Sequence, residues 1–329
     1  MNEPAATSLD ELLIGESAAI AAVKRAVLRY APSRLSVLVQ GPTGSGKEIV
    51  ATALHAFGKR TGALVSLNVC ALGDGLFEDA LFGHVRGAFT GAFLDAPGYL
   101  AEGNGGTVFL DEISGLSMPA QAKLLRALET GVYRAIGASR DRMSDFRLVT
   151  ASNVNLASMV AACAFREDLL HRIGGCVITL PALRDRAEDI PLLVRHFLAR
   201  AGASHRSLSR RAEVRLKQHE WRGNVRELRN AVERMLIGAA GPIIGPDDVM
   251  EALGAYENDE ASPEMDLTTQ RIRDALRQHG GDAAAAAESL GVHRATFYRW
   301  MHKAGIRAAT YAILRGSGTA QSVPALRIS

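Results

Sequence analysis

The sequence predicts an α/β domain built on a parallel sheet, followed by smaller all-helical parts. Strand-like apolar runs alternate with helical patterns through the first two thirds of the 329 residues. This alternation is typical of a parallel sheet covered by helices on both faces. From about residue 187 apolar side chains recur at three- and four-residue spacing, which indicates helices. The length favours about two domains.

Five apolar runs are the expected strands of the sheet. They cover residues 35–40, 63–69, 107–110, 146–151 and 176–180. The first run enters a glycine-rich turn, and residues 46–57 after that turn have the pattern of a helix. Helical patterns also separate the later runs, so the strands are expected to be joined by crossover helices.

Changes in composition predict the domain boundaries. Residues 257–264 are polar, acidic and interrupted by Pro263, which is typical of a linker. A compact helical pattern follows, and the last residues are rich in small side chains, as in a frayed tail. The expected parts are an N-terminal extension (1–13), an α/β unit (14–184), a helical lid (185–253), a linker (254–265), a C-terminal helical domain (266–308) and a tail (309–329).

Composition and charge exclude some classes of protein. Hydrophobic residues make up 47% and charged residues 22%, so bulk disorder is excluded. A net charge of +3 excludes a uniformly basic nucleic-acid coat. Of the 38 basic and 35 acidic side chains, nine basic and four acidic lie in residues 266–329. The positive excess is therefore C-terminal, as in a small DNA-binding module.

Three features predict a cytoplasmic protein. Cys70, Cys163 and Cys176 form no C-x-x-C pair, and we expect reduced, mostly buried thiols. The N-terminus has neither the basic nor the apolar segment of a signal peptide. No uncharged apolar run approaches the ~20 residues of a membrane span, so none is expected.

The strongest local signal is a phosphate-binding loop between the first strand and its helix. Its residues are Gly41, Pro42, Thr43, Gly44, Ser45, Gly46 and Lys47, with the spacing G-x-x-x-x-G-K. The glycines let backbone N–H groups turn toward a phosphate, and Lys47 would reach the β- and γ-phosphates. Glu48 stands where most such loops have a Ser or Thr on Mg²⁺. The metal would therefore depend more on another carboxylate.

A second motif supplies that carboxylate. Residues 105–112 form an apolar strand that ends in Asp111 and Glu112. Asp111 would bind Mg²⁺, and Glu112 would orient and polarise the attacking water. Together with the phosphate-binding loop, this motif predicts nucleotide hydrolysis with ATP and Mg²⁺ as cofactors.

Between these motifs lies the sequence GAFTGA, residues 87–92. It is small and flexible around one aromatic side chain, and nothing in it binds phosphate or metal. From the residues alone, this segment is equally well explained as the tip of a hairpin with no function of its own.

The C-terminal domain has the pattern of a helix-turn-helix. An amphipathic helix (271–279) is followed by two glycines, a short helix capped by Asp282, and a basic helix (293–303). Phe297 and Met301 should pack inward. Any small helical bundle can show such a pattern. The expected contacts to bases or phosphates come from His293, Arg294, Thr296, Tyr298, Arg299 and Lys303.

The GAFTGA run after a phosphate-binding loop of the form GKE, with GGTVFLDE behind it, resembles the bacterial sigma-54-dependent transcriptional activators. The resemblance extends from about residue 14 to residue 301 and makes Glu48 the usual residue at its position. It implies an AAA+ P-loop NTPase fold with a helical lid and a C-terminal Fis-type helix-turn-helix domain. It also implies that a hexapeptide contacts sigma-54: Gly87, Ala88, Phe89, Thr90, Gly91 and Ala92.

The resemblance assigns roles to further residues. Asn68 matches the asparagine that holds the catalytic glutamate, and Asn153 matches sensor I near the γ-phosphate. Arg166 and Arg172 match the segment that supplies arginine fingers to the neighbouring subunit, a device worth roughly 10³–10⁵ in rate. Arg226 matches the sensor II arginine that reaches the bound nucleotide.

Three residues depart from the family pattern. Pro42 replaces a usual acidic residue, Arg222 replaces a usual proline, and Val85 stands where a glutamate normally precedes the hexapeptide. The departure at Val85 bears on control of the loop, because that acid can help couple it to the nucleotide state. None of the three removes a catalytic group.

The resemblance implies a mechanochemical activator of transcription. A homo-oligomeric ring, a hexamer, would bind enhancer DNA, hydrolyse ATP and remodel the closed complex of the sigma-54 RNA polymerase holoenzyme into the open complex. Since only residues 1–13 precede the matched region, we expect regulation in trans by another protein rather than by an attached sensory domain.

Two alternatives have specific counter-evidence. An AAA+ motor acting directly on DNA would not need the intact GAFTGA sequence. A non-catalytic DNA-binding regulator would be expected to have lost Lys47, Asp111 or Glu112, and all three are present.

Overall fold

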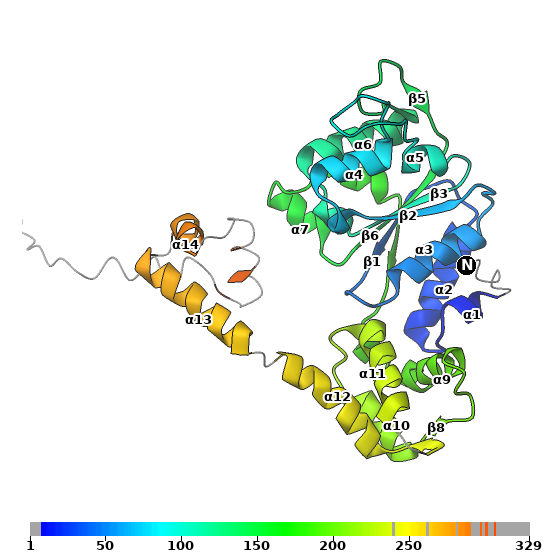
Figure 1. The fold of residues 1–329 in the computed structure, drawn as a ribbon. Coiled ribbons are helices and arrows are strands. Elements are labelled where there is room, and N and C mark those ends of the chain that lie inside the picture. The colour runs from blue at the N-terminus through cyan, green and yellow to red at the C-terminus, as the bar shows by residue number, and fades with distance from the viewer. Residues whose placement is uncertain are drawn as a thin grey trace, which may run out of the picture. The chain divides into compact units, whose positions relative to one another are not determined.

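The computed structural model of the chain describes residues 8–238, 241–260, 263–280 and 282–290, together with Phe297, Trp300, Met301 and Ile306. The chain divides into two compact units, Met1–Ala252 and Leu253–Ser329. Figure 1 shows their elements, and each unit is described by itself below.

The first unit is built on a five-stranded sheet with the strand order β2-β3-β6-β1-β7. Every neighbouring pair in it is parallel. The strands are β1 (Val37–Gln40), β2 (Leu64–Asn68), β3 (Thr107–Asp111), β6 (Arg147–Ser152) and β7 (Cys176–Thr179). The predicted parallel sheet is confirmed, and each expected run lies within two residues of a strand.

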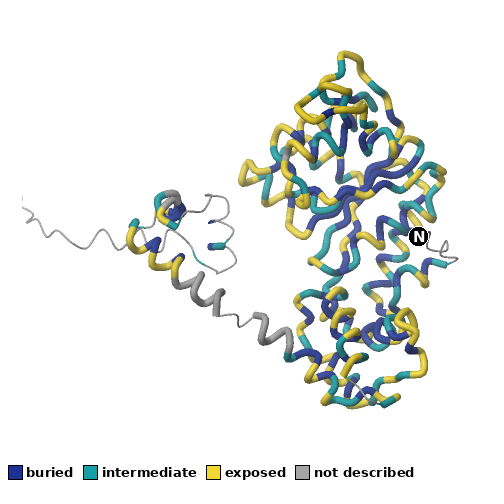
Figure 2. Tube along the Cα trace, viewed as in Figure 1, coloured by how far each residue is buried: buried dark blue, intermediate teal, exposed yellow. Residues whose placement is uncertain are grey.

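Helices cover both faces of this sheet. One face packs against α1 (Leu9–Leu12), α2 (Ala18–Tyr30) and α3 (Lys47–Ala56). The other packs against α4 (Asp74–Phe82), α5 (Tyr99–Glu102), α6 (Met118–Thr130), α7 (Leu156–Ala161) and α8 (Glu167–Ile173). β3 supplies both cores, because Phe109 joins the first cluster while Val108 and Leu110 join the second. Figure 2 shows the strands as the buried centre of this unit.

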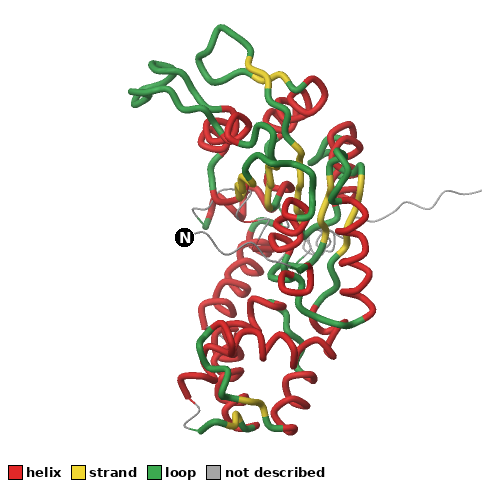
Figure 3. The backbone as a smooth tube through the Cα atoms, turned by 90° about the vertical axis from the view of Figure 1, so that its right-hand side faces the viewer, coloured by secondary structure: helices red, strands yellow, loops and turns green. Residues whose placement is uncertain are grey.

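Short 3-10 turns connect the sheet to its surroundings. They are η1 (Val69–Ala71) after β2, η2 (Ile113–Gly115) after β3 and η3 (Leu183–Asp189) before the lid. A small antiparallel pair, β4 (Val132–Tyr133) and β5 (Arg142–Met143), lies beside long loops at one end of the unit (top of Figure 3).

The helical lid contains α9 (Ile190–Arg200), α10 (Arg210–Gln218) and α11 (Asn224–Gly238), and α12 (Pro246–Glu260) begins in it. Two short parallel strands, β8 (Ser207–Leu208) and β9 (Ile243–Ile244), join its loops. Trp221 is buried here, and its Nε1 donates to the Leu216 carbonyl at 2.8 Å. The helical pattern predicted for this part of the chain is confirmed.

The second unit contains α13 (Pro263–Gln278) and α14 (Ala283–Ser289). The Asp282 carboxylate accepts from the Ala285 amide at 3.2 Å, so the predicted cap is present. Phe297 and Met301 are buried in its core, as expected. The expected DNA contacts lie outside the described residues: His293, Arg294, Thr296, Tyr298, Arg299 and Lys303.

The acidic stretch predicted as a linker differs in local structure. α12 continues to Glu260, and α13 begins at Pro263. Proline fits the first position of a helix because its missing N–H would have no helical partner there. The polar composition marks a change of unit but does not prevent helix formation.

The cysteines differ from expectation as well. Cys176 is buried on β7, but Cys70 and Cys163 are exposed, so the prediction of mostly buried thiols is wrong. Cys70 lies in the η1 turn, and Cys163 lies in a loop with a positive φ of 54°. Both positions are at the surface. Among the residues that the structure describes, no helix is long and apolar enough to cross a membrane.

A buried carboxylate ties the segment before α2 to the start of the lid. Asp189 is fully buried and accepts from the Glu16 amide at 2.7 Å, the Ser17 amide at 2.8 Å and the Ser17 hydroxyl at 2.6 Å. Gly15 has a φ of 139°, and a Cβ on it would lie 2.6 Å from an Asp189 oxygen. Only glycine therefore fits at position 15.

We predict that Asp189→Ala lowers the free energy of unfolding by about 3 kcal/mol, because it leaves buried donors without their charged acceptor. Ser17→Ala removes one hydroxyl and the α2 cap and should cost about 1 kcal/mol. Urea unfolding followed by circular dichroism compares the two variants. Equal losses would show that the carboxylate is not the main anchor.

Candidate nucleotide site and projecting loop

The phosphate-binding loop connects β1 to α3, with Lys47 as the first helical residue. Gly44 and Gly46 have φ values of 75° and 104°, in the region that favours glycine. The Lys47 ammonium donates to the carbonyls of Gly41 at 3.1 Å and Pro42 at 3.3 Å. The lysine side chain is therefore folded back over the phosphate-binding loop.

The two acids lie directly opposite this lysine. Glu112 Oε1 is 4.0 Å from Lys47 Nζ, and the Glu112 amide donates to Asp111 Oδ1 at 3.0 Å. Burial raises the pKa of the Glu112 carboxyl, while the neighbouring Lys47 charge opposes that rise. Glu112 also has a φ of 54°, a strained conformation for a residue other than glycine.

The two predicted asparagines flank this centre. Asn68 donates to Asp111 Oδ2 at 3.5 Å and accepts from the Ala71 amide at 3.1 Å. The carboxylate that this side chain contacts is that of Asp111, because the β2–β3 register places Asn68 opposite Asp111. Asn153 donates to the Thr43 hydroxyl at 3.0 Å, so it touches the phosphate-binding loop.

The lid contacts the same loop through its helix α11. The buried Asn224 donates to the Thr43 carbonyl at 2.9 Å and accepts from the Leu183 amide at 2.8 Å. The Arg226 amide donates to the Gly44 carbonyl at 3.2 Å. Nothing in the sequence marks Asn224 as a site residue, because its φ of 55° and its distant hydrogen-bond partners depend on the fold.

A second residue that the sequence did not reveal is Arg186. It is buried, burial lowers the pKa of its guanidinium, and its Nη2 donates to the Ser45 carbonyl at 3.1 Å. The Ser45 hydroxyl and Arg186 Nε are buried without a hydrogen-bond partner among the described residues. Unused polar groups beside a glycine-rich loop fit the oxygens of a bound phosphate.

The two expected arginine fingers lie on the segment around α8. Arg166 forms a two-bond ion pair with Asp168, at 3.0 and 2.7 Å, and its amide donates to Gln121 Oε1 at 2.8 Å. Arg172 donates to the Leu128 carbonyl at 2.7 Å. The contacts of both arginines are thus with α6 and α8 rather than with the phosphate-binding loop of the same chain.

The hexapeptide forms the tip of a loop between α4 and α5. The Gly87 amide donates to the Ala92 carbonyl at 2.8 Å, and the Ala92 amide donates to the Phe89 carbonyl at 3.0 Å. Gly87 and Gly91 have φ values of 81° and 104°. Phe89 and Thr90 are exposed, so this tip is open to a partner.

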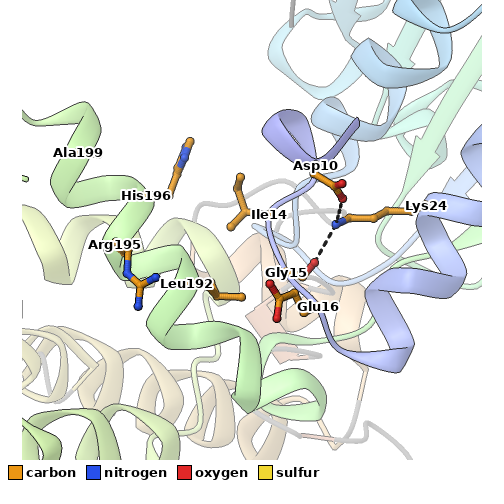
Figure 4. Close-up of a pocket in the computed structure, with 9 residues that line it drawn as sticks. All are labelled: Asp10, Ile14, Gly15, Glu16, Lys24, Leu192, Arg195, His196 and Ala199. Atoms are coloured by element: carbon orange, nitrogen blue, oxygen red, sulfur yellow. Dashed lines mark hydrogen bonds and ion pairs between the residues drawn. The ribbon is translucent and has the colours of Figure 1, made fainter. Parts of the chain in front are cut away.

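A surface pocket of about 520 Å³ lies between the N-terminal segment and α9 (Figure 4). It contains none of the predicted site residues. Lys24 crosses its edge, donating to Asp10 at 2.5 Å and to the Gly15 carbonyl at 2.8 Å. The pocket is lined by Asp10, Ile14, Gly15, Glu16, Lys24, Leu192, Arg195, His196 and Ala199.

Family models match three successive parts of the chain. The sigma-54 interaction domain matches residues 13–179, the AAA+ ATPase lid domain matches residues 184–266, and the Fis family of bacterial regulatory proteins matches residues 268–303. The chain belongs to the sigma-54-dependent transcriptional regulators. Its fold is that of an AAA+ ATPase with a helical lid and a C-terminal helix-turn-helix domain.

Individual relatives agree with this assignment. The chain is 38% identical to the C4-dicarboxylate transport transcriptional regulatory protein DctD of Rhizobium meliloti over 94% of this chain and 68% of that protein. It is 39% identical to the transcriptional regulatory protein ZraR of Salmonella typhimurium, over 89% of this chain and 69% of that protein.

Solved structures show the same relation. The structure of NtrX from Brucella abortus in complex with ATP has a TM-score of 0.64 and 31% identity, covering 89% of this chain and 69% of that chain. Thermotoga maritima RuvB, at 18% identity and a TM-score of 0.52, shares the fold alone. The family models and the ATP complex of the similar NtrX structure together support nucleotide binding and ATPase activity in general.

We predict that Gly44→Ala weakens ATP binding at least ~tenfold, since φ is unfavourable and the new Cβ would lie 2.2 Å from the Gly223 carbonyl oxygen. The loop and the lid must then move apart. Titration with a fluorescent ATP analogue measures the affinity. Gly73→Ala is the control, because a Cβ there meets no atom within 4 Å; unchanged binding in Gly44→Ala would contradict the packing argument.

Proposed function

We propose that this chain activates transcription at sigma-54 promoters by hydrolysing ATP and remodelling the closed complex of sigma-54 RNA polymerase into the open complex. One observation carries the proposal: the phosphate-binding loop, the acids Asp111 and Glu112, and the exposed GAFTGA tip all belong to the same α/β unit. The first supplies energy, and the second is the surface that would act on sigma-54.

Nucleotide binding is assigned to the loop after β1. Backbone amides of residues 41–46 and the Lys47 ammonium would bind the phosphates, with Glu48 at the start of α3. The Asp111 carboxylate would hold Mg²⁺, and its oxygen chemistry suits that hard cation. When bound, the metal would screen phosphate charge. The nearby Arg226 backbone joins the lid to this loop.

Glu112 is the residue proposed to activate water. Its carboxylate lies beside Lys47 and Asp111, at the carboxyl end of β3. A pKa raised by burial suits a general base, because the carboxylate then takes up a proton more readily. Asn68 contacts Asp111, and Asn153 contacts Thr43; these contacts support the proposed role of both asparagines in sensing the phosphates.

Assembly and DNA binding complete the proposal. Arg166 and Arg172 are accessible to a neighbouring subunit, and in a homo-oligomeric ring, a hexamer, they would stabilise charge on its γ-phosphate. The ion pair with Asp168 would have to exchange for the phosphate. The C-terminal domain, proposed at residues 266–308, would bind enhancer DNA through its basic helix.

We predict that Glu112→Gln lowers kcat for ATP hydrolysis at least ~10²-fold while leaving ATP binding intact. In the parent protein kcat should fall on acidification at a pH above the usual range for glutamate, since burial raises this pKa and protonation removes the base. Steady-state hydrolysis against pH measures both effects. Glu129→Gln, an exposed carboxyl on α6, is the control; a kcat within ~threefold of the parent would exclude Glu112 as the base.

We predict that Thr90→Ala hydrolyses ATP at the parent rate but forms no open complex on a sigma-54 promoter, because the exposed tip is changed and the nucleotide site is not. Permanganate footprinting detects the open complex, and Thr90→Ser is the conservative control. Open-complex formation by Thr90→Ala would refute the role of the tip. Hydrolysis stimulated by DNA, without any opening by the parent protein, would favour a DNA motor.

A further inference from the structure

We propose that His84 and Asp79 position Phe89: the two side chains hold its ring at the base of the loop between α4 and α5 (residues 83–98) and restrain residues 87–92 from binding sigma-54 until nucleotide binds. This inference rests on the proposed function, in which the GAFTGA tip contacts sigma-54. Neither residue belongs to the nucleotide site or to the hexapeptide.

Two contacts define the arrangement. His84 Nδ1 lies 2.5 Å from Asp79 Oδ1, and the carboxylate accepts the ring N–H. The His84 ring meets the Phe89 ring edge to face, with centroids 5.0 Å apart and planes at 66°. Such aromatic pairs are favourable beyond the area they bury. The carboxylate therefore fixes the orientation of the imidazole that contacts Phe89.

Exposure along the loop agrees with a restrained Phe89. Phe89 is 44% exposed, whereas Phe93, four residues later, is 81% exposed and Leu94 is 77% exposed. The ring of Phe89 is thus partly sheltered although its neighbours project freely. His84, at 14%, and Asp79, at 24%, are mostly covered themselves.

The backbone of His84 is fixed from both sides. It pairs with Ala96 in an antiparallel bridge, with bonds of 3.0 and 2.9 Å, and with Ile136 in a parallel bridge. The Ile136 bridge reaches the loop that joins β4 and β5. Because this frame is fixed, loss of the Asp79 contact would free Phe89 and the tip at residues 87–92, while the base of the loop at His84 would stay in place.

α4 links this arrangement to the hydrolytic centre. Asp79 lies on α4, which follows η1, and the first turn of η1 is bound by Asn68 through the Ala71 amide. The amide oxygen of Asn68 makes that contact, and the amide nitrogen of the same side chain donates to Asp111. A displacement of Asn68 when nucleotide binds would therefore reach the segment that carries Asp79, and from there His84 and Phe89.

The same helix offers a matched control. Glu78, next to Asp79, pairs at 2.5 Å with Lys123 on α6 and not with the loop. Glu78→Ala removes a carboxylate–cation pair from α4 without touching His84. Asp79→Asn keeps an acceptor for the His84 ring N–H, whereas Asp79→Ala and His84→Ala remove the arrangement.

Two readouts on the full-length chain test the proposal. Hydrogen exchange of the Gly87 and Ala92 amides, without nucleotide, reports the restraint directly. Binding of purified sigma-54, with no nucleotide and with ADP–aluminium fluoride, reports its consequence. We expect Asp79→Ala and His84→Ala to raise exchange and nucleotide-free sigma-54 binding about three- to tenfold, the range that an aromatic pair supports. Asp79→Asn and Glu78→Ala should match the parent.

Unchanged hydrogen exchange of the Gly87 and Ala92 amides in Asp79→Ala and His84→Ala, with ATP hydrolysis retained, would overturn the proposal. His84 would then have only a packing role. If His84→Ala does not fold, Asp79→Ala compared with Asp79→Asn gives the answer. Faster exchange in a protein whose parent form never binds sigma-54 with ADP–aluminium fluoride would support the restraint and overturn the proposed function. The two failures are thereby distinct.

Discussion

The parallel register of the sheet is the constraint on which the site depends. Since β2, β3, β6 and β1 run in one direction, their carboxyl ends meet at one edge. That edge receives Asn68 from β2, Asp111 and Glu112 from the end of β3, and the phosphate-binding loop from β1. Lys47 and Asp111, more than 60 positions apart in the sequence, are therefore brought together by the sheet and need no strong direct contact with each other.

The lid is joined to this edge through Thr43. Its hydroxyl accepts from Asn153 at the end of β6, and its carbonyl accepts from Asn224 at the start of α11. The amide of Leu183, where the chain enters the lid, is bound to the same Asn224. One residue of the phosphate-binding loop is thus hydrogen-bonded both to the end of the sheet and to the lid.

Features set by local spacing could be predicted from the sequence. The glycines and Lys47, the strand ending in Asp111 and the inward Phe297 each depend on neighbours in the chain, and the structure agrees on their placement. Asp189 could not be predicted in this way, because its partners lie 172 and 173 residues away. Nor could the His84–Phe89 contact, which depends on how a loop folds back on itself.

The positive φ of Glu112 restricts which residues can occupy that position at all. Asparagine, aspartate and glycine tolerate such a backbone best, but none of them extends a carboxylate as far as glutamate does. Branched side chains suffer a steric penalty before any chemistry is considered. Position 112 must therefore meet two separate requirements, one on backbone conformation and one on side-chain chemistry, and few residue types meet both. Such a site is expected to drift slowly over evolutionary time even where the surrounding loop does not.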